Sequence, residues 1–219
     1  MPQHGITTDQ ASQLQPARRV KSERNMAKRQ SKAKPTWEEV KAELASFDRA
    51  ALLAVLQDLY AASEGNRAFL HARFGLGQDP LQAYKKIIDR WLWPDVFRGE
   101  ETSVSRAKRA ISDYRKASGD PEGLAELMVY YCEQAAGFCR DVDHQDAAYR
   151  DALVRMFEQA LRTATDAVKS ETVRNCLLGT LDQVRSIGRE LGYGIGDDMD
   201  VLFAEFVSSS RRRVIHGNR

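Results

Sequence analysis

The chain has 219 residues, of which 42% are hydrophobic and 29% are charged, a composition typical of a globular domain of ordinary size. No apolar run approaches the roughly 20 residues that cross a bilayer, and the N-terminal region has no apolar signal segment. We therefore expect a cytoplasmic protein without a membrane span. The formal net charge of +2 is unevenly distributed, with +6 on residues 1–35, −8 on residues 36–210 and +4 on residues 211–219. An acidic central region disfavours a broad nucleic-acid surface, whereas basic ends attract phosphate.

Both basic ends are predicted to be tails. Residues 1–35 contain few large apolar side chains and no sustained periodicity, so they cannot bury enough surface to offset the entropy of ordering. Met26 offers an alternative translation start to Met1. The C-terminal segment "SSSRRRVIHGNR", residues 208–219, is predicted to be a second basic tail. A single domain is then expected over residues 36–207.

The first helices of this domain are marked by their capping residues. Thr36 and Glu39 have the spacing of a capping box, Asp48 precedes the next apolar segment, and Gly75 ends a third. Apolar residues recur at helical spacing, and no segment shows sustained alternation of period two. The stripes of the first two helices are formed by Trp37, Val40 and Leu44, and by Leu52, Leu53, Leu56, Leu59 and Tyr60.

The remaining helices follow the same rules. Asp-Pro pairs at 79–80 and 120–121 open the fourth and sixth helices, and Pro94 ends the fourth. A fifth helix is predicted near residues 104–118, followed after the sixth by helices near 146–164, 173–187 and 199–207. The sequence thus predicts an all-α fold of eight or nine helices in antiparallel hairpins. Its arrangement is either a compact bundle or a degenerate helical repeat.

Three segments carry a family resemblance. They read "ALLAVLQDLYAASEGNRAFL", "SRAKRAISDYRKASGDPEGLAELMVYYCEQAAGFCRDV" and "GYGIGDDMD". On these, the chain resembles a bacterial domain family of unknown function whose members are small all-helical proteins. The resemblance covers about residues 36–207 and leaves both basic ends outside. It implies an all-helical fold, and it implies no activity, cofactor or catalytic residue.

The closing motif "RRRVIHG" suggests one catalytic alternative. Arg211 and His216 have the spacing of the arginine and histidine in the HEPN group of helical ribonucleases, which that motif resembles. In that group both residues lie on one helix of a dimer and act on the RNA 2′-hydroxyl and phosphate. Here Arg212 stands where the motif commonly has Asn, Asp or His, and only three residues follow His216. A catalytic histidine requires a fixed position, so the sequence favours a basic tail over an active site.

Two further clusters are interpreted structurally. The carboxylates at the start of the last helix are expected to stabilise its free N–H groups rather than to bind a cation, and "GYGIG" at 192–196 is expected to form a tight turn. Cys132 and Cys139 lie two helical turns apart on an apolar face, so we expect buried thiols and neither a metal nor a cofactor. The capping carboxylates are Asp197, Asp198 and Asp200, and Glu205 belongs to the same acidic group later in the helix. A metal site at the thiols would need Asp141, Asp143 and His144 beside Cys132 and Cys139.

One basic and aromatic region provides the candidate binding residues. Basic side chains lie opposite the apolar stripe of the helix near 104–118 and on the preceding helix, where they would bind an acidic partner or phosphate or simply be solvated. Trp91 and Trp93 precede Pro94, and Phe97 follows it. We expect most of this aromatic cluster in the core, with any exposed tryptophan marking a partner-binding patch. The candidates are Lys85, Lys86, Arg90, Trp91, Trp93, Arg106, Arg109 and Lys116.

These patterns favour a non-catalytic interaction module that binds a protein partner. A HEPN-type ribonuclease using Arg211 and His216 is the first alternative. The second is nucleic-acid binding through the basic tails alone. The partner, the pathway and the oligomeric state are not specified by the sequence.

Overall fold

The computed structural model describes residues 34–216, apart from the side chains of 207 and 209–216. This part of the chain is built from nine α-helices and one 3₁₀ turn without a strand, which confirms the predicted all-α class. No helix within it has the length and apolar character to span a membrane. Its contacts divide the chain into two units, residues 1–56 and 57–219. The predicted N-terminal tail lies almost entirely outside the described residues.

The first unit contains α2 (Trp37–Leu44) and the start of α3 (Arg49–Ala62). The capping box is present, since the Thr36 amide donates to Glu39 Oε2 at 2.6 Å and the Glu39 amide donates to Thr36 Oγ1 at 3.4 Å. Asp48 Oδ1 accepts from the Ala51 amide at 2.7 Å and so opens α3 as predicted. Neither helix contains a buried residue. Local capping and helix propensity therefore form these helices, and the leucine stripe does not enter a core.

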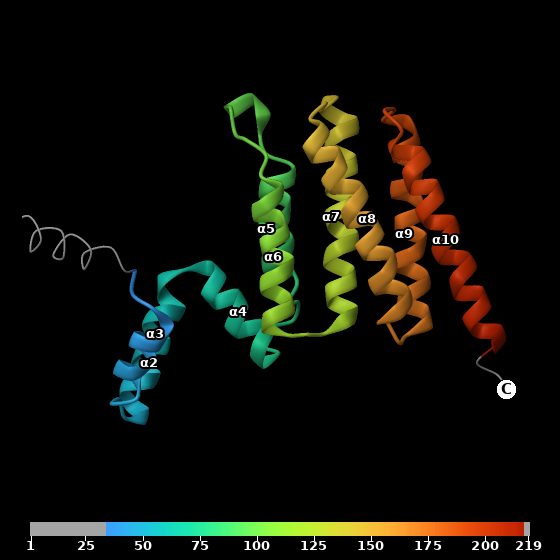
Figure 1. Ribbon diagram of the computed structural model, residues 1–219. Coiled ribbons are helices and arrows are strands. Elements are labelled where there is room, and N and C mark those ends of the chain that lie inside the picture. The colour runs from blue at the N-terminus through green and yellow to red at the C-terminus, as the bar shows by residue number, and fades with distance from the viewer. Residues whose placement is uncertain (1–33, 217–219) are drawn as a thin grey trace, which may run out of the picture. The chain divides into compact units, whose positions relative to one another are not determined.

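The second unit is a series of helical hairpins (Figure 1). Gly75 ends its first helix with a φ of +63°, a left-handed conformation that suits glycine. The Asp120–Pro121 pair begins the longest core helix as predicted, with Asp120 accepting from the amides of Glu122 and Gly123. The elements are α4 (Glu64–Phe74), α5 (Gln82–Leu92), η1 (Val96–Arg98), α6 (Val104–Ala117), α7 (Pro121–Val142), α8 (Ala147–Asp166), α9 (Glu171–Glu190) and α10 (Ile195–His216).

Three hairpins stand side by side: α5 with α6, α7 with α8, and α9 with α10 (Figure 1). Helix α7 packs against both α5 and α9, while α8 packs against α10, so each hairpin contacts the next. The core lies mainly between these layers, and α7 supplies its centre with residues such as Leu127, Tyr131 and Phe138. Packing in series resembles the helical-repeat alternative more than a closed bundle.

The last helix is longer than predicted. The sequence places it at 199–207, whereas α10 begins at Ile195 and continues to His216. The GYGIG turn forms as expected, because Gly192 and Gly194 adopt φ of +72° and +79° on either side of an exposed Tyr193. Gly196 then lets α10 approach α9, since a Cβ there would lie 2.6 Å from the Arg189 Cα.

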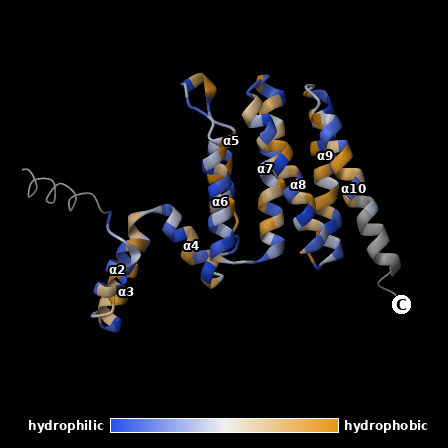
Figure 2. Cartoon of the chain, viewed as in Figure 1, coloured by the Kyte–Doolittle hydropathy of each residue, from blue (hydrophilic) through white to orange (hydrophobic). Residues whose placement is uncertain are grey.

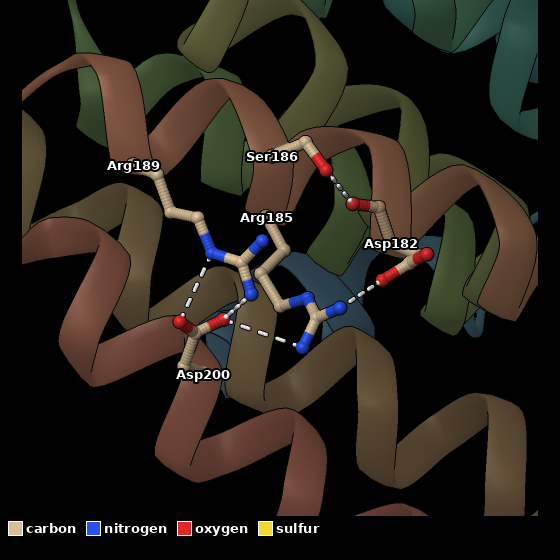
Figure 3. Close-up of polar contacts among 5 residues, drawn as sticks. All are labelled: Asp182, Arg185, Ser186, Arg189 and Asp200. Atoms are coloured by element: carbon tan, nitrogen blue, oxygen red, sulfur yellow. Dashed lines mark hydrogen bonds and ion pairs between the residues drawn. The ribbon is translucent and has the colours of Figure 1, made fainter.

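One of the predicted capping carboxylates has a different role (Figure 3). Asp197 and Asp198 lie in the first turn of α10, where acids are favourable. Asp200 instead accepts two hydrogen bonds from Arg189 of α9, at 2.8 and 3.0 Å, and pairs with Arg185 at 3.3 Å. These ion pairs tie α9 to α10. The interpretation of Asp200 as a cap was wrong because the partner arginines lie on the neighbouring helix.

Asp200→Asn is expected to lower the melting temperature slightly at pH 7, because exposed ion pairs contribute little and are screened by salt. Hydrogen bonding and charge from Arg189 lower the pKa of Asp200, so the stabilisation is complete above its unfolded pKa of about 3.9 and is lost as the pH falls through the lower folded value. The difference in melting temperature between parent and variant should therefore shrink towards pH 3. A difference that grows on acidification would contradict this assignment.

Candidate functional site

Helix α3 is largely apolar (Figure 2), and its large apolar side chains are exposed. All but Arg49, Gln57 and Asp58 of its 14 residues are apolar, so it lacks a polar face. A helix of this kind is normally enclosed by other protein. Instead no residue of α3 is buried, and four leucines keep between 38% and 56% of their surface accessible. These are Leu52, Leu53, Leu56 and Leu59. We call the surface of α3 that contains them the leucine face.

A second candidate is a basic and aromatic cluster on α5 and α6. The guanidinium carbon of Arg106 lies 4.1 Å from the ring centroid of Trp91, and that of Arg90 lies 5.3 Å from it. Within the described chain neither arginine makes an ion pair. Arg109 lies one turn from Arg106 and pairs with Asp113 at 3.7 Å. The structure therefore brings together four of the eight predicted binding residues, namely Arg90, Trp91, Arg106 and Arg109.

A cavity of about 280 Å³ lies beside this cluster, and we call it the Tyr84 cavity. Its most unusual group is the Tyr84 side chain, which is 2% exposed and whose hydroxyl finds no hydrogen-bond partner among the described residues. Leaving a buried hydroxyl unpaired costs about 1–3 kcal/mol. Burial, together with charge repulsion from Asp113 and from the Tyr114 phenol, raises the pKa of Tyr84 to about 12, so the phenol is a neutral donor. The lining residues are Gly65, Tyr84, Ile87, Trp91, Arg106, Arg109, Ala110 and Asp113.

The other predicted cations lie elsewhere. Lys85 pairs with Glu126 at 2.5 Å and borders a separate cavity of about 430 Å³ between α5, α7 and α9. Glu133 also lines that cavity, and desolvation raises its pKa, although the positive charge of Lys85 acts to lower it. Lys116 pairs with Asp113 at 3.6 Å, and Lys86 is exposed. These three lysines therefore do not line the Tyr84 cavity.

The expected aromatic core around Pro94 does not form. Phe97 is 97% exposed and Trp91 is half-buried. Trp93 keeps 36% of its surface accessible, while the rest packs against Phe138 and over Gly137. The expectation was wrong for Phe97, because η1 runs along the surface, where apolar rings are not enclosed. Trp91 of α5 packs against the core without being buried. Trp93 is thus a partly packed residue at the edge of the core.

The Arg211–His216 motif lies on the last part of α10. The backbone is helical through His216, so both residues belong to one helix rather than to a tail that begins at 208. Positions five apart on an α-helix are separated by about 140° around its axis. The side chains of Arg211 and His216 lie outside the described residues. The ribonuclease hypothesis therefore stays a prediction.

The expected burial of Cys132 and Cys139 is confirmed. Cys132 and Cys139 are buried, Cys176 is exposed, and all three thiols are free. Burial raises the pKa of Cys139 to about 11 and that of Cys132 well above its usual range, which keeps both thiols protonated and unreactive. Among the described residues, no three His, Cys, Asp or Glu side chains are grouped as a metal site would require.

Sequence reasoning did not identify Tyr84 and Asp113. Tyr84 and Trp91 lie seven residues apart on one helix, as do Arg106 and Asp113, so each pair shares a face by helical periodicity. This seven-residue spacing is the sequence signal from which both residues could have been added to the candidate site. Which face of α5 meets which face of α6 depends on packing between helices, and no local pattern specifies it.

Comparison of the chain with models of protein families, with curated proteins and with solved structures finds no match.

Proposed function

We propose that this chain is a non-catalytic interaction module that binds an apolar helical surface of a protein partner with its leucine face. The observation that carries the proposal is a helix that is apolar around its circumference and has no buried residue. Contiguous exposed apolar surface is a feature of protein-binding sites, and amphipathic helices commonly supply the complementary surface.

Charge indicates what kind of partner fits this face. Residues 36–62 carry five acidic and two basic side chains, a net charge of −3. A second copy of the chain would bring two net negative surfaces together, which opposes self-association. A different protein with basic residues around an apolar helix face would have complementary charge. The basic residues of 1–35 and 211–219 would add a salt-dependent attraction to acidic partners or nucleic acid.

The test is a paired substitution on the leucine face, Leu53→Glu with Leu56→Glu, in the full chain. A photo-crosslinker placed at position 52 identifies the protein that contacts α3, and that protein is then purified. Calorimetric titration of the purified pair should show affinity reduced more than ~100-fold, because two leucine contacts of about 1.5–3 kcal/mol each are removed. Since both leucines are exposed, the melting temperature should change little.

Leu76→Glu with Val201→Glu is the matched control, since these residues are as exposed but lie outside α3. Affinity should be retained in this control. Binding that survives the Leu53 and Leu56 substitutions would contradict the proposal. A dimer seen by analytical ultracentrifugation and lost in that variant would assign the leucine face to a second copy. RNA cleavage that disappears in His216→Ala would show that the chain is a ribonuclease.

A further inference from the structure

We propose that the Tyr84 cavity binds one carboxylate of an acidic peptide segment, held by Arg106 and by the Tyr84 hydroxyl. This site is separate from the leucine face, and the inference does not rest on the function proposed for it. Every group that lines the cavity lies within residues 57–219, which form one unit.

Two hydrogen-bond donors at the cavity, on Tyr84 and Arg106, are available to a ligand. The Tyr84 hydroxyl is buried without a partner in the described part of the chain, and Arg106 has no ion pair there. A guanidinium presents a planar fork of N–H groups that matches a carboxylate in a bidentate manner. A carboxylate would also accept from the phenol and so satisfy a hydroxyl that the fold leaves unpaired.

Neighbouring groups in the cavity wall hold these donors in place before a ligand binds. Trp91 holds the Arg106 guanidinium against its ring at 4.1 Å, which limits the rotamers that binding must restrict. The acceptor in the cavity wall, Asp113, is paired with Arg109 at 3.7 Å and with Lys116 at 3.6 Å. Among the described residues, Arg106 is therefore the cation in the wall that has no ion pair and can receive a ligand.

The wall also favours a carboxylate over a phosphate. Asp113 is a negative charge in the wall, and a phosphate monoester carries about −1.5 to −2 charges on one group, so it is repelled more strongly than a single carboxylate. Nucleic-acid grooves also commonly stack bases on open aromatic rings. Here the Trp91 ring is already contacted by the guanidiniums of Arg90 and Arg106. A cavity of about 280 Å³ suits a single side chain.

The experiment measures fluorescence anisotropy of a fluorescein-labelled, C-amidated hexaglutamate peptide titrated with the full chain, with hexaglutamine as the neutral probe. Hexaglutamate should bind and hexaglutamine should not. Tyr84→Phe, which removes the unpaired hydroxyl alone, should weaken binding about tenfold, as expected for a hydrogen bond to a charged group. Arg106→Lys should also weaken it about tenfold, because lysine keeps the charge but loses the fork.

Arg115→Gln is the control for general electrostatics, since Arg115 is an exposed residue of α6 that does not line the cavity. It should change affinity less than about twofold, because exposed charges act weakly at this distance. Equal losses in Arg115→Gln and Arg106→Lys, full binding by Tyr84→Phe, or no binding by the parent would each overturn the proposal. So would displacement of the peptide by inorganic phosphate or oligothymidine at lower concentration than by free hexaglutamate.

Discussion

Phe157→Ala is expected to lower the free energy of unfolding by about 3–5 kcal/mol, the range for removing a buried aromatic ring. Phe157 lies in α8 and has no accessible surface. Its ring is part of the core between the hairpins, where close packing leaves little room for neighbours to collapse into the space. Chemical denaturation monitored by circular dichroism measures the change. The melting temperature should fall by on the order of 10 °C.

Phe97→Ala is the matched control, because it removes the same ring from a side chain that is 97% exposed. Its effect should stay within about 0.5 kcal/mol. Similar losses in the free energy of unfolding for Phe157→Ala and Phe97→Ala would show that the core does not lie between the hairpins as described. A loss in Phe97→Ala alone would show that η1 packs against the core.

Gly137→Ala is expected to destabilise the protein by about 1–3 kcal/mol through overpacking. A Cβ added at Gly137 in α7 would lie 2.6 Å from Trp93 Cζ3, so the indole ring must move. Trp93 is wedged at the edge of the core between this glycine and Phe138, which limits where it can go. Denaturation measures the loss of stability. A change in tryptophan emission, recorded in a Trp37→Phe and Trp91→Phe background, reports the displaced ring.

Gly179→Ala makes the same chemical change in the exposed middle of α9, where no atom of the described residues lies within 4 Å of the added Cβ. It should stabilise the protein by up to about 1 kcal/mol, because alanine favours the helix over glycine. The two substitutions therefore have opposite signs. If Gly137→Ala also stabilised the protein, Trp93 would not be packed against α7 at Gly137.

Much of the secondary structure followed from local chemistry. The capping box of Thr36 and Glu39, the Asp48 cap and the Asp-Pro start at 120–121 act within one helical turn, so their residue types were sufficient to place three helix starts. The end of α10 was placed wrongly because the polar run after Val207 has no apolar periodicity, yet the helix continues to His216.

The candidate site was predicted only in part. Periodicity placed Arg106 and Arg109 on the polar side of their helix, and composition drew attention to Trp91. The sequence could not show that Arg106 lies over Trp91 or that Asp200 pairs with Arg189. Nor could it show that the buried Tyr84 hydroxyl has no partner in the part of the chain that the structure describes. Each of these contacts joins residues on different helices or depends on what surrounds a side chain.

Helix positions, capping and the uneven charge are properties of the amino-acid order, because they depend on groups a few residues apart or on simple totals. The burial of a side chain and the identity of its contact partners are not properties of the amino-acid order. The leucines of α3 and those of the core have equally apolar side chains, and whether a leucine is enclosed depends on which other helices pack around it. The exposed leucine face and the unpaired Tyr84 hydroxyl, which support the two proposals, therefore became visible only once the helices were assembled.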